Sequence, residues 1–196
     1  MGKRCRGRRK TGQLSAKSEV SGLEQGIIQV YTGDGKGKTT AAIGQAVRAH
    51  GRGLRVIIFQ LLKAADGTGE QEALARLDPP LPFHPLGSGQ FIFNREATPA
   101  EIAQAEAGWQ QICTAMNSQD YDLIVIDEFS HALNKGLLPL QPVVEVLRRK
   151  PVGVELVLTG RNMPEAILEL ADLVTEMRLI KHPYQKGIKA RIGIEY

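Results

Sequence analysis

The sequence predicts a three-layer α/β protein, in which a mainly parallel β-sheet carries helices on both faces. Three observations lead to this prediction. Short apolar runs of strand length, such as 27–31 and 123–126, alternate along the chain with longer helical patterns. The run 56–59 is apolar at every position, which is typical of a strand buried on both faces. A glycine-rich turn joins the first apolar run to the first helical pattern.

Turn and capping signals delimit the elements expected in the first half of the chain. Gly51 and Gly53 end the first helix, and the prolines between 78 and 82 exclude regular structure there. Thr98 as N-cap, followed by Pro99 and Glu101, forms a capping box that starts the longest helix. Strands and helices are therefore expected in alternation over 27–31, 38–50, 54–60, 70–77, 83–86 and 99–117.

The same alternation continues in the second half of the chain. Pro183 and Gly187 separate two closing stretches whose composition is typical of strands. Strands are expected over 123–126 and 154–158, and helices over 140–149 and 164–171. The two closing strand-like stretches are 173–180 and 189–194.

Length and composition indicate one globular domain. A chain of 196 residues can form a single sizeable core, and its 42% hydrophobic and 23% charged residues are ordinary for a soluble protein. We expect the domain to span 26–196, because residues 1–25 are polar and lack a periodic apolar pattern, which favours disorder. No apolar run approaches the length of a membrane span, and no signal-peptide pattern opens the chain.

The positive net charge of the chain comes from its first ten residues. These carry six basic side chains and no acid, which leaves 19 basic and 21 acidic side chains, a charge of −2, for residues 11–196. Such a basic tail is either an arm for nucleic acid or another anionic surface, or a disordered solubilising extension. The rest of the chain lacks a stripe of basic and aromatic residues, so nucleic-acid binding is not expected.

The two cysteines, Cys5 and Cys113, have no metal-site spacing and lie in the tail and in a helical pattern. A structural disulfide is therefore not expected, and a reducing, cytoplasmic setting is favoured. The four histidines have no ligand spacing either, so Mg²⁺ is the only metal that we expect protein ligands to hold.

Residues 32–40, Thr-Gly-Asp-Gly-Lys-Gly-Lys-Thr-Thr, form a phosphate-binding loop between the first strand and the first helix. Glycines let consecutive backbone N–H groups face one anion, and Lys38 adds a compact positive charge. The Thr39 hydroxyl is placed to reach a Mg²⁺ bound to the phosphates. The standard spacing requires its first glycine at position 32, but this chain has Thr32 there and Gly33 one place later. The expected nucleotide-binding residues are Gly33, Asp34, Gly35, Lys36, Gly37, Lys38, Thr39, Thr40 and Arg161.

A second acidic site follows the apolar run 123–126, where Asp127 and Glu128 end the strand. In a parallel sheet these acids lie at the same edge as the phosphate loop, where they can hold Mg²⁺ directly or through water. Either acid alone is also consistent with a helix cap or a surface salt bridge. Arg161, at the same edge, either reaches phosphate or is a solvated loop arginine. Arg48 fits a surface helix arginine better than a contact to the sugar.

The loop and five further stretches make the chain similar to the P-loop type of ATP:corrinoid adenosyltransferases. The resemblance covers roughly residues 26–196 and is most specific in the closing segment combined with the shifted glycines of the loop. Besides 31–40, the matching stretches are Asn94-Arg95-Glu96, Val125-Ile126-Asp127-Glu128, Leu158-Thr159-Gly160-Arg161, 170–176 and 181–196.

The resemblance implies a P-loop NTPase (RecA-like) fold and a reaction other than phosphoryl transfer. In this family, Co(I) of a corrinoid attacks the 5′ carbon of ATP and triphosphate leaves, in cobalamin biosynthesis or salvage. Lys38 and Glu128 are then the expected catalytic residues, and Thr39, Glu128 and Asp127 the expected Mg²⁺ site. The implied partners are an electron-donating reductase or flavodoxin-like protein and a second copy in a homodimer, with residues 15–25 covering the site.

The corrinoid side of the site departs from the family pattern. Members of the family carry a Phe and a Trp that displace the lower cobalt ligand, at positions occupied here by Ser88 and Gln90. Phe91 and Phe93 lie nearby but out of register, and either take over this task or are core residues. A RecA-like ATP-hydrolysing protein with a nucleic-acid-binding tail is the alternative function, and an ATP-dependent binding module is a third.

Overall fold

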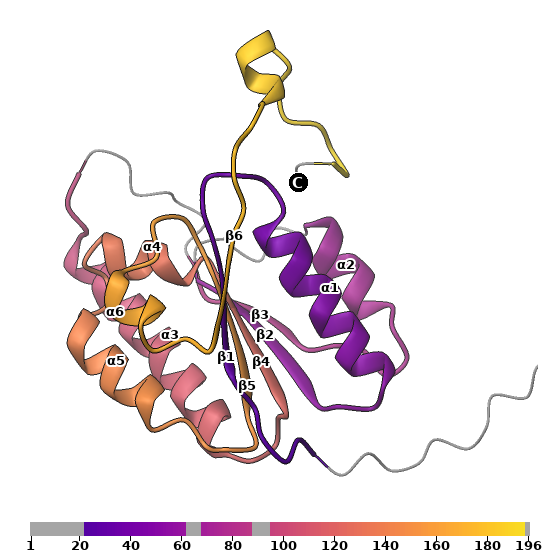
Figure 1. The fold of residues 1–196 in the computed structure, drawn as a ribbon, viewed down its shortest axis with the longest axis vertical. Helices are drawn as coiled ribbons and strands as arrows, with labels where there is room; N and C mark the ends of the chain where they lie inside the picture. Colours follow the sequence, from indigo (N-terminus) through magenta and orange to yellow (C-terminus); the bar gives the residue numbers. More distant parts are fainter. Residues whose placement is uncertain (1–21, 62–67, 88–94, 195–196) are drawn as a thin grey trace, which may run out of the picture.

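The protein folds around a six-stranded sheet with helices on both faces (Figure 1). The computed structural model describes residues 22–61, 68–87 and 95–194, so the expected tail lies outside the described residues except for 22–25. All five strand pairings are parallel, and the strand order is β3-β2-β4-β5-β1-β6. The predicted three-layer α/β architecture is therefore confirmed.

The observed elements follow the predicted alternation closely. The strands are β1 (Ile28–Thr32), β2 (Val56–Gln60), β3 (Phe83–Pro85), β4 (Leu123–Asp127), β5 (Glu155–Thr159) and β6 (Leu173–Glu176). The helices are α1 (Lys38–Gly51), α2 (Gly69–Ala75), α3 (Pro99–Asn117), α4 (Phe129–Asn134), α5 (Leu140–Arg148), α6 (Glu165–Leu168) and a 3₁₀ turn, η1 (Pro183–Lys186). The predicted capping box of Thr98 and Glu101 is present at the start of α3.

Side chains of the central strands alternate between two apolar layers. On β4, Leu123 and Val125 pack with buried alanines of α1, while Ile124 and Ile126 pack in the cluster that includes Trp109 of α3. Helices α1 and α2 cover one face, and α3 to α6 cover the other (Figure 1). The fully apolar strand runs are thus explained by burial on both faces.

Two expectations about local structure were wrong or incomplete. Residues 189–191 have no regular structure and 192–194 form a turn, so the predicted strand over 189–194 is absent, and Ile192 is 83% exposed. The alternating pattern of 189–194 fits a strand, but the chain leaves the sheet after β6, and none of the described strands pairs with this segment (Figure 1). Helix α4 was not predicted, because six residues are too few to establish a helical period.

Arg55 and Asp122 join the beginnings of β2 and β4. Nη2 of Arg55 donates to Oδ1 of Asp122 at 2.7 Å, and the backbone N–H of Arg55 donates to Oδ2 at 2.8 Å. The Asp122 side chain is only 5% exposed, whereas that of Arg55 is 55% exposed. The hydrogen bond from Arg55 lowers the pKa of Asp122, so this contribution to stability is present above the ordinary aspartate pKa and is lost as the pH falls.

Replacing Asp122 with Ala is therefore expected to lower the free energy of unfolding by about 1.5–2 kcal/mol at neutral pH, because it removes charge-assisted bonds on a half-exposed pair. Glu72→Ala is the matched control, since it removes the exposed Glu72–Arg76 pair of α2 and is expected to cost less than about 0.5 kcal/mol. Urea unfolding measures both. Equal losses of unfolding free energy in the two variants would show that the Arg55–Asp122 contact does not stabilise the pairing of β2 with β4.

Candidate active site

The phosphate loop runs from the end of β1 to the start of α1 and contains two glycines in the left-handed region. Gly33 has φ 91° and Gly37 has φ 120°, backbone angles that residues other than glycine rarely adopt. Thr32, which stands where the standard spacing has glycine, is instead the last residue of β1. Its hydroxyl accepts a hydrogen bond from the Met163 N–H at 3.3 Å. Thr32 is therefore part of the strand, and the turn begins at Gly33.

The end of β6 holds the phosphate loop in place. The Met177 N–H donates to the Thr32 carbonyl at 2.8 Å, and the Gly35 N–H donates to the Met177 carbonyl at 2.6 Å. A Cβ atom at Gly35 would lie 2.6 Å from that same carbonyl oxygen, so the close approach requires glycine here. Two segments far apart in the sequence thus meet at the loop.

Lys38 lies inside the loop rather than on its surface. Its Nζ atom donates to the carbonyl of Gly33 at 2.6 Å and to that of Gly35 at 2.7 Å, and the residue is 9% exposed. Burial, and then the nearby Arg161 guanidinium, lower the pKa of Lys38. The loop carbonyls therefore fix the position of this cation beside the backbone N–H groups of the turn.

Asp127 connects the loop helix to the sheet. Its Oδ1 accepts from the hydroxyl of Thr39 at 2.9 Å and from that of Thr159 at 2.6 Å, and its Oδ2 accepts from Nε2 of Gln60 at 2.7 Å. The carboxylate is only 1% exposed. A buried carboxylate needs such donors, and here they come from α1, β5 and β2.

Glu128 occupies a left-handed conformation immediately after β4. Its φ is 58°, and its backbone N–H donates to the Thr159 hydroxyl at 3.0 Å. A non-glycine residue in this region is uncommon and marks a locally constrained backbone. The turn places Glu128 on the wall of the cavity beside the phosphate loop.

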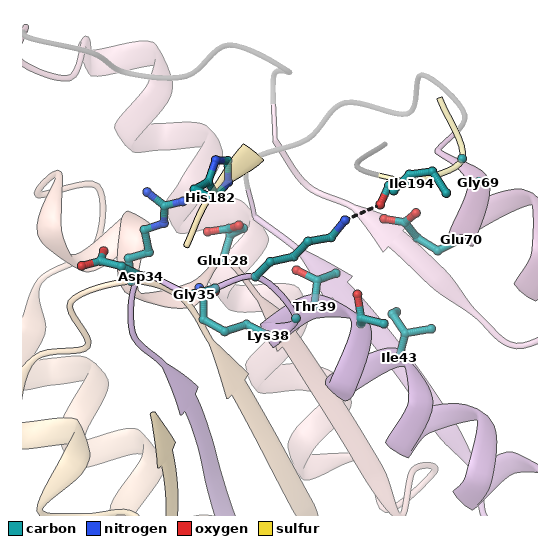
Figure 2. A pocket seen from close by; sticks show the side chains of 15 residues that line it. Asp34, Gly35, Lys38, Thr39, Ile43, Gly69, Glu70, Glu128, His182 and Ile194 are labelled. Carbon is teal, nitrogen blue, oxygen red and sulfur yellow. Dashed lines mark hydrogen bonds between the residues drawn. The ribbon is translucent and has the colours of Figure 1, made fainter. Parts of the chain in front are cut away.

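The cavity at this edge has a volume of about 550 Å³ and combines three cations with three acids. The cations are Lys36, Lys38 and Arg161, and the acids are Asp34, Glu70 and Glu128. Figure 2 shows Asp34, Glu128 and His182 on one side and Ile43 and Glu70 on the other. It also marks the hydrogen bond from Lys36 Nζ to the Ile194 carbonyl, at 2.7 Å, which joins the C-terminal segment to the loop.

Most of the predicted site residues meet at this cavity. Residues 34–40, Glu128 and Arg161 line it. Gly33 lies behind the loop as an acceptor for Lys38, and Asp127 lies behind Thr39 rather than on the wall. Arg48 is exposed and donates to Gln45, as a surface arginine does. Phe91 and Phe93, like Ser88 and Gln90, lie outside the described residues.

Sequence reasoning missed several residues at the site. Glu70 and Gly69 follow the loop at the end of β2, a position that by itself indicates proximity to the sheet edge. His182 lies between the two predicted closing strands, and Gly193 and Ile194 lie in the second of them, 189–194. Gln60 and Thr159 gave no signal, because their importance depends on hydrogen bonds to a residue of another strand.

The described residues contain no helix long and apolar enough to cross a membrane and no group of three or more His, Cys, Asp or Glu side chains suited to holding a metal.

Comparison with known proteins agrees with the geometry. Residues 24–196 match the family model described as ATP:corrinoid adenosyltransferase BtuR/CobO/CobP. The chain is 36% identical over 188 residues to the corrinoid adenosyltransferase of Pseudomonas aeruginosa, with 96% of this chain and 92% of the relative covered. It is 37% identical over 173 residues to the corrinoid adenosyltransferase of Escherichia coli strain K12, with 88% of this chain and 87% of the relative covered. It is 35% identical over 184 residues to corrinoid adenosyltransferase CobA of Salmonella typhimurium, with 94% of this chain and 92% of the relative covered. The chain belongs to the ATP:corrinoid adenosyltransferase family.

Proposed function

We propose that the protein transfers the 5′-deoxyadenosyl group of ATP to the Co(I) centre of a corrinoid. A cobalt–carbon bond forms at C5′ while the C5′–O bond breaks, and the electron pair of that bond leaves with triphosphate. The observation that carries this proposal is the cationic cavity on the phosphate loop in a chain that matches the family over 24–196. Because cobalt is the nucleophile, no nucleophilic side chain is needed.

The cations of the cavity suit a leaving triphosphate. Lys38, Lys36 and Arg161 line one space with the backbone of the loop and the N-terminus of α1, and together they oppose the negative charge that develops as the bond breaks. Lys38 and Glu128 are the catalytic residues of this proposal. Their contribution is positioning and electrostatic stabilisation rather than proton transfer.

Mg²⁺ fits the oxygen donors beside the loop. The hydroxyl of Thr39 and the carboxylate of Glu128 both line the cavity, and hard oxygen ligands of this kind are those that Mg²⁺ prefers. Asp127 supports the site by accepting a hydrogen bond from the Thr39 hydroxyl, which leaves the lone pairs of that oxygen for the cation. When bound, Mg²⁺ would neutralise part of the triphosphate charge as a Lewis acid.

The remaining parts of the proposal concern partners and setting. A Co(I) substrate requires an electron donor, and a reductase or flavodoxin-like protein supplies that chemistry. The proposed assembly is a homodimer in the cytoplasm, in which residues 15–25 cover the site, and the proposed pathway is cobalamin biosynthesis or salvage. Phe91 and Phe93 are proposed to form the apolar wall that keeps the lower ligand and water from cobalt.

The products distinguish adenosyl transfer from ATP hydrolysis. The protein is incubated with Mg-ATP, a reductant and a corrinoid, and phosphate products are separated by ion-exchange chromatography. We expect triphosphate together with a light-sensitive cobalt–carbon product, both dependent on the corrinoid. Formation of ADP and phosphate at the same rate without the corrinoid would favour the RecA-like alternative.

Lys38→Ala is expected to raise the Kd for Mg-ATP by at least about 100-fold, because removing one member of a buried charge pair costs about 3–5 kcal/mol. Lys150→Ala is a matched control. Lys150 is half-buried and, like Lys38, donates to backbone carbonyls, those of Gly26 and Val154, both at 2.7 Å, but it does not line the cavity. The Lys150→Ala control should have a lower free energy of unfolding but an unchanged Kd for Mg-ATP. Titration calorimetry measures the Kd of both variants. Near-normal ATP affinity of Lys38→Ala would refute the site.

Phe91→Ala and Phe93→Ala are expected to lower kcat/KM for the corrinoid about tenfold or more while leaving the Kd for ATP unchanged, because each removes apolar surface worth about 1.5–3 kcal/mol. Steady-state assays with the corrinoid varied at saturating ATP measure this effect. If both variants turn over the corrinoid like the parent protein, these aromatic residues do not form the wall.

A further inference from the structure

Gln60 is a fully buried polar residue that the reaction does not obviously require. It is the last residue of β2, its exposed fraction is 0%, and it pairs in register with Asp127 of β4. Its Nε2 donates to Oδ2 of Asp127 at 2.7 Å. Its Oε1 is buried, and no donor within the described parts of the chain hydrogen-bonds to it.

A half-satisfied amide in this position is costly for folding. A buried carbonyl oxygen without a donor loses its hydration and gains nothing in return, whereas an apolar side chain of similar volume would avoid the loss. The residues before Gln60 on β2, Val56 to Phe59, are all apolar and buried. The presence of glutamine at the fifth position is therefore best explained by what its amide nitrogen does to Asp127.

Hydrogen bonds on both oxygens restrain the orientation of the Asp127 carboxylate. The χ2 angle of aspartate has a broad energy minimum, so neighbouring donors set the orientation of the carboxylate, and the hydroxyls of Thr39 and Thr159 both bond Oδ1. The bond from Gln60 holds the second oxygen, Oδ2, and adds a restraint against rotation of the carboxylate plane. This plane sets the direction in which the Thr39 proton points.

We infer that Gln60 is a positioning residue for the metal–nucleotide site, acting through Asp127 on the hydroxyl of Thr39. Gln60 is not part of the cavity wall and does not touch the nucleotide; Thr39 does line the wall. With its proton held by Asp127, the Thr39 oxygen presents lone pairs to a divalent cation. The inference rests on the proposed role of Thr39 in holding Mg²⁺.

Gln60→Met tests the inference, because methionine keeps the volume and removes the donor. The Kd for ATP is measured by titration calorimetry on the full chain, once with Mg²⁺ and once with EDTA. We expect affinity for Mg-ATP to fall about tenfold, as the loss of a hydrogen bond to a charged group predicts, and affinity for metal-free ATP to be unchanged. If the Met variant melts below the assay temperature, Gln60→Asn replaces it, since its shorter amide cannot reach Oδ2 in the same geometry.

Gln29→Met is the matched control for this experiment. Gln29 of β1 also donates its amide to a carboxylate, that of Glu155, and is half-buried in the same sheet, but neither residue lines the cavity. Its replacement should leave both ATP affinities unchanged. Equal losses of affinity with Mg²⁺ and with EDTA in Gln60→Met would mean that Gln60 only supports the fold, and would overturn the inference.

A double-mutant cycle shows whether Gln60 acts through Asp127. In the Asp127→Asn background, Gln60→Met is expected to cause no further loss of Mg-ATP affinity, whereas independent effects would add. Additive losses would overturn the inference while leaving the proposed function intact. A parent protein that binds ATP equally well with and without Mg²⁺ would instead contradict the metal site itself, so the two failures are distinguishable.

Discussion

The buried carboxylate of Asp127 is the constraint on which the arrangement of the site depends. With 1% exposure it cannot rely on water, so it must be met by donors, and these come from β2, β5 and the first turn of α1. Satisfying one acid therefore fixes the positions of Gln60, Thr159 and Thr39 relative to one another. Because Thr159 also accepts the Glu128 N–H, the same network holds the left-handed turn that carries Glu128 to the cavity.

The shifted glycine of the phosphate loop follows from how the loop is supported. Thr32 ends β1, pairs with Glu176 of β6 and accepts from Met163, so a side chain is useful where the standard motif has glycine. The turn then begins at Gly33, and the Met177 carbonyl accepts the Gly35 N–H at a distance that leaves no room for a side chain on Gly35. A loop fixed in this way can hold a triphosphate as a whole. This is what a leaving group requires, whereas phosphoryl transfer requires one phosphate to be exposed to attack.

The sequence was sufficient for features that depend on local chemistry or on sheet geometry. Apolar runs identified β1, β2, β4 and β5, and the phosphate loop with Asp127-Glu128 identified the edge where the site lies. Features that depend on tertiary partners could not be found in this way. Residues 189–194 have the alternation of a strand but pair with no strand in the described part of the chain, and the partner of the Gln60 amide is an acid 67 positions away. His182 and Ile194 reach the cavity because the chain turns back over the loop after β6.

The central claim is that the bond broken lies between C5′ and its oxygen, so that the loop retains the entire triphosphate. ATP labelled with ¹⁸O at the 5′ bridging position tests this directly, with mass spectrometry of the released triphosphate after turnover with a reduced corrinoid. Complete retention of the label in triphosphate is the predicted result, because cobalt attacks carbon. Recovery of the label with the adenosine portion would mean that a P–O bond breaks instead and would contradict the claim.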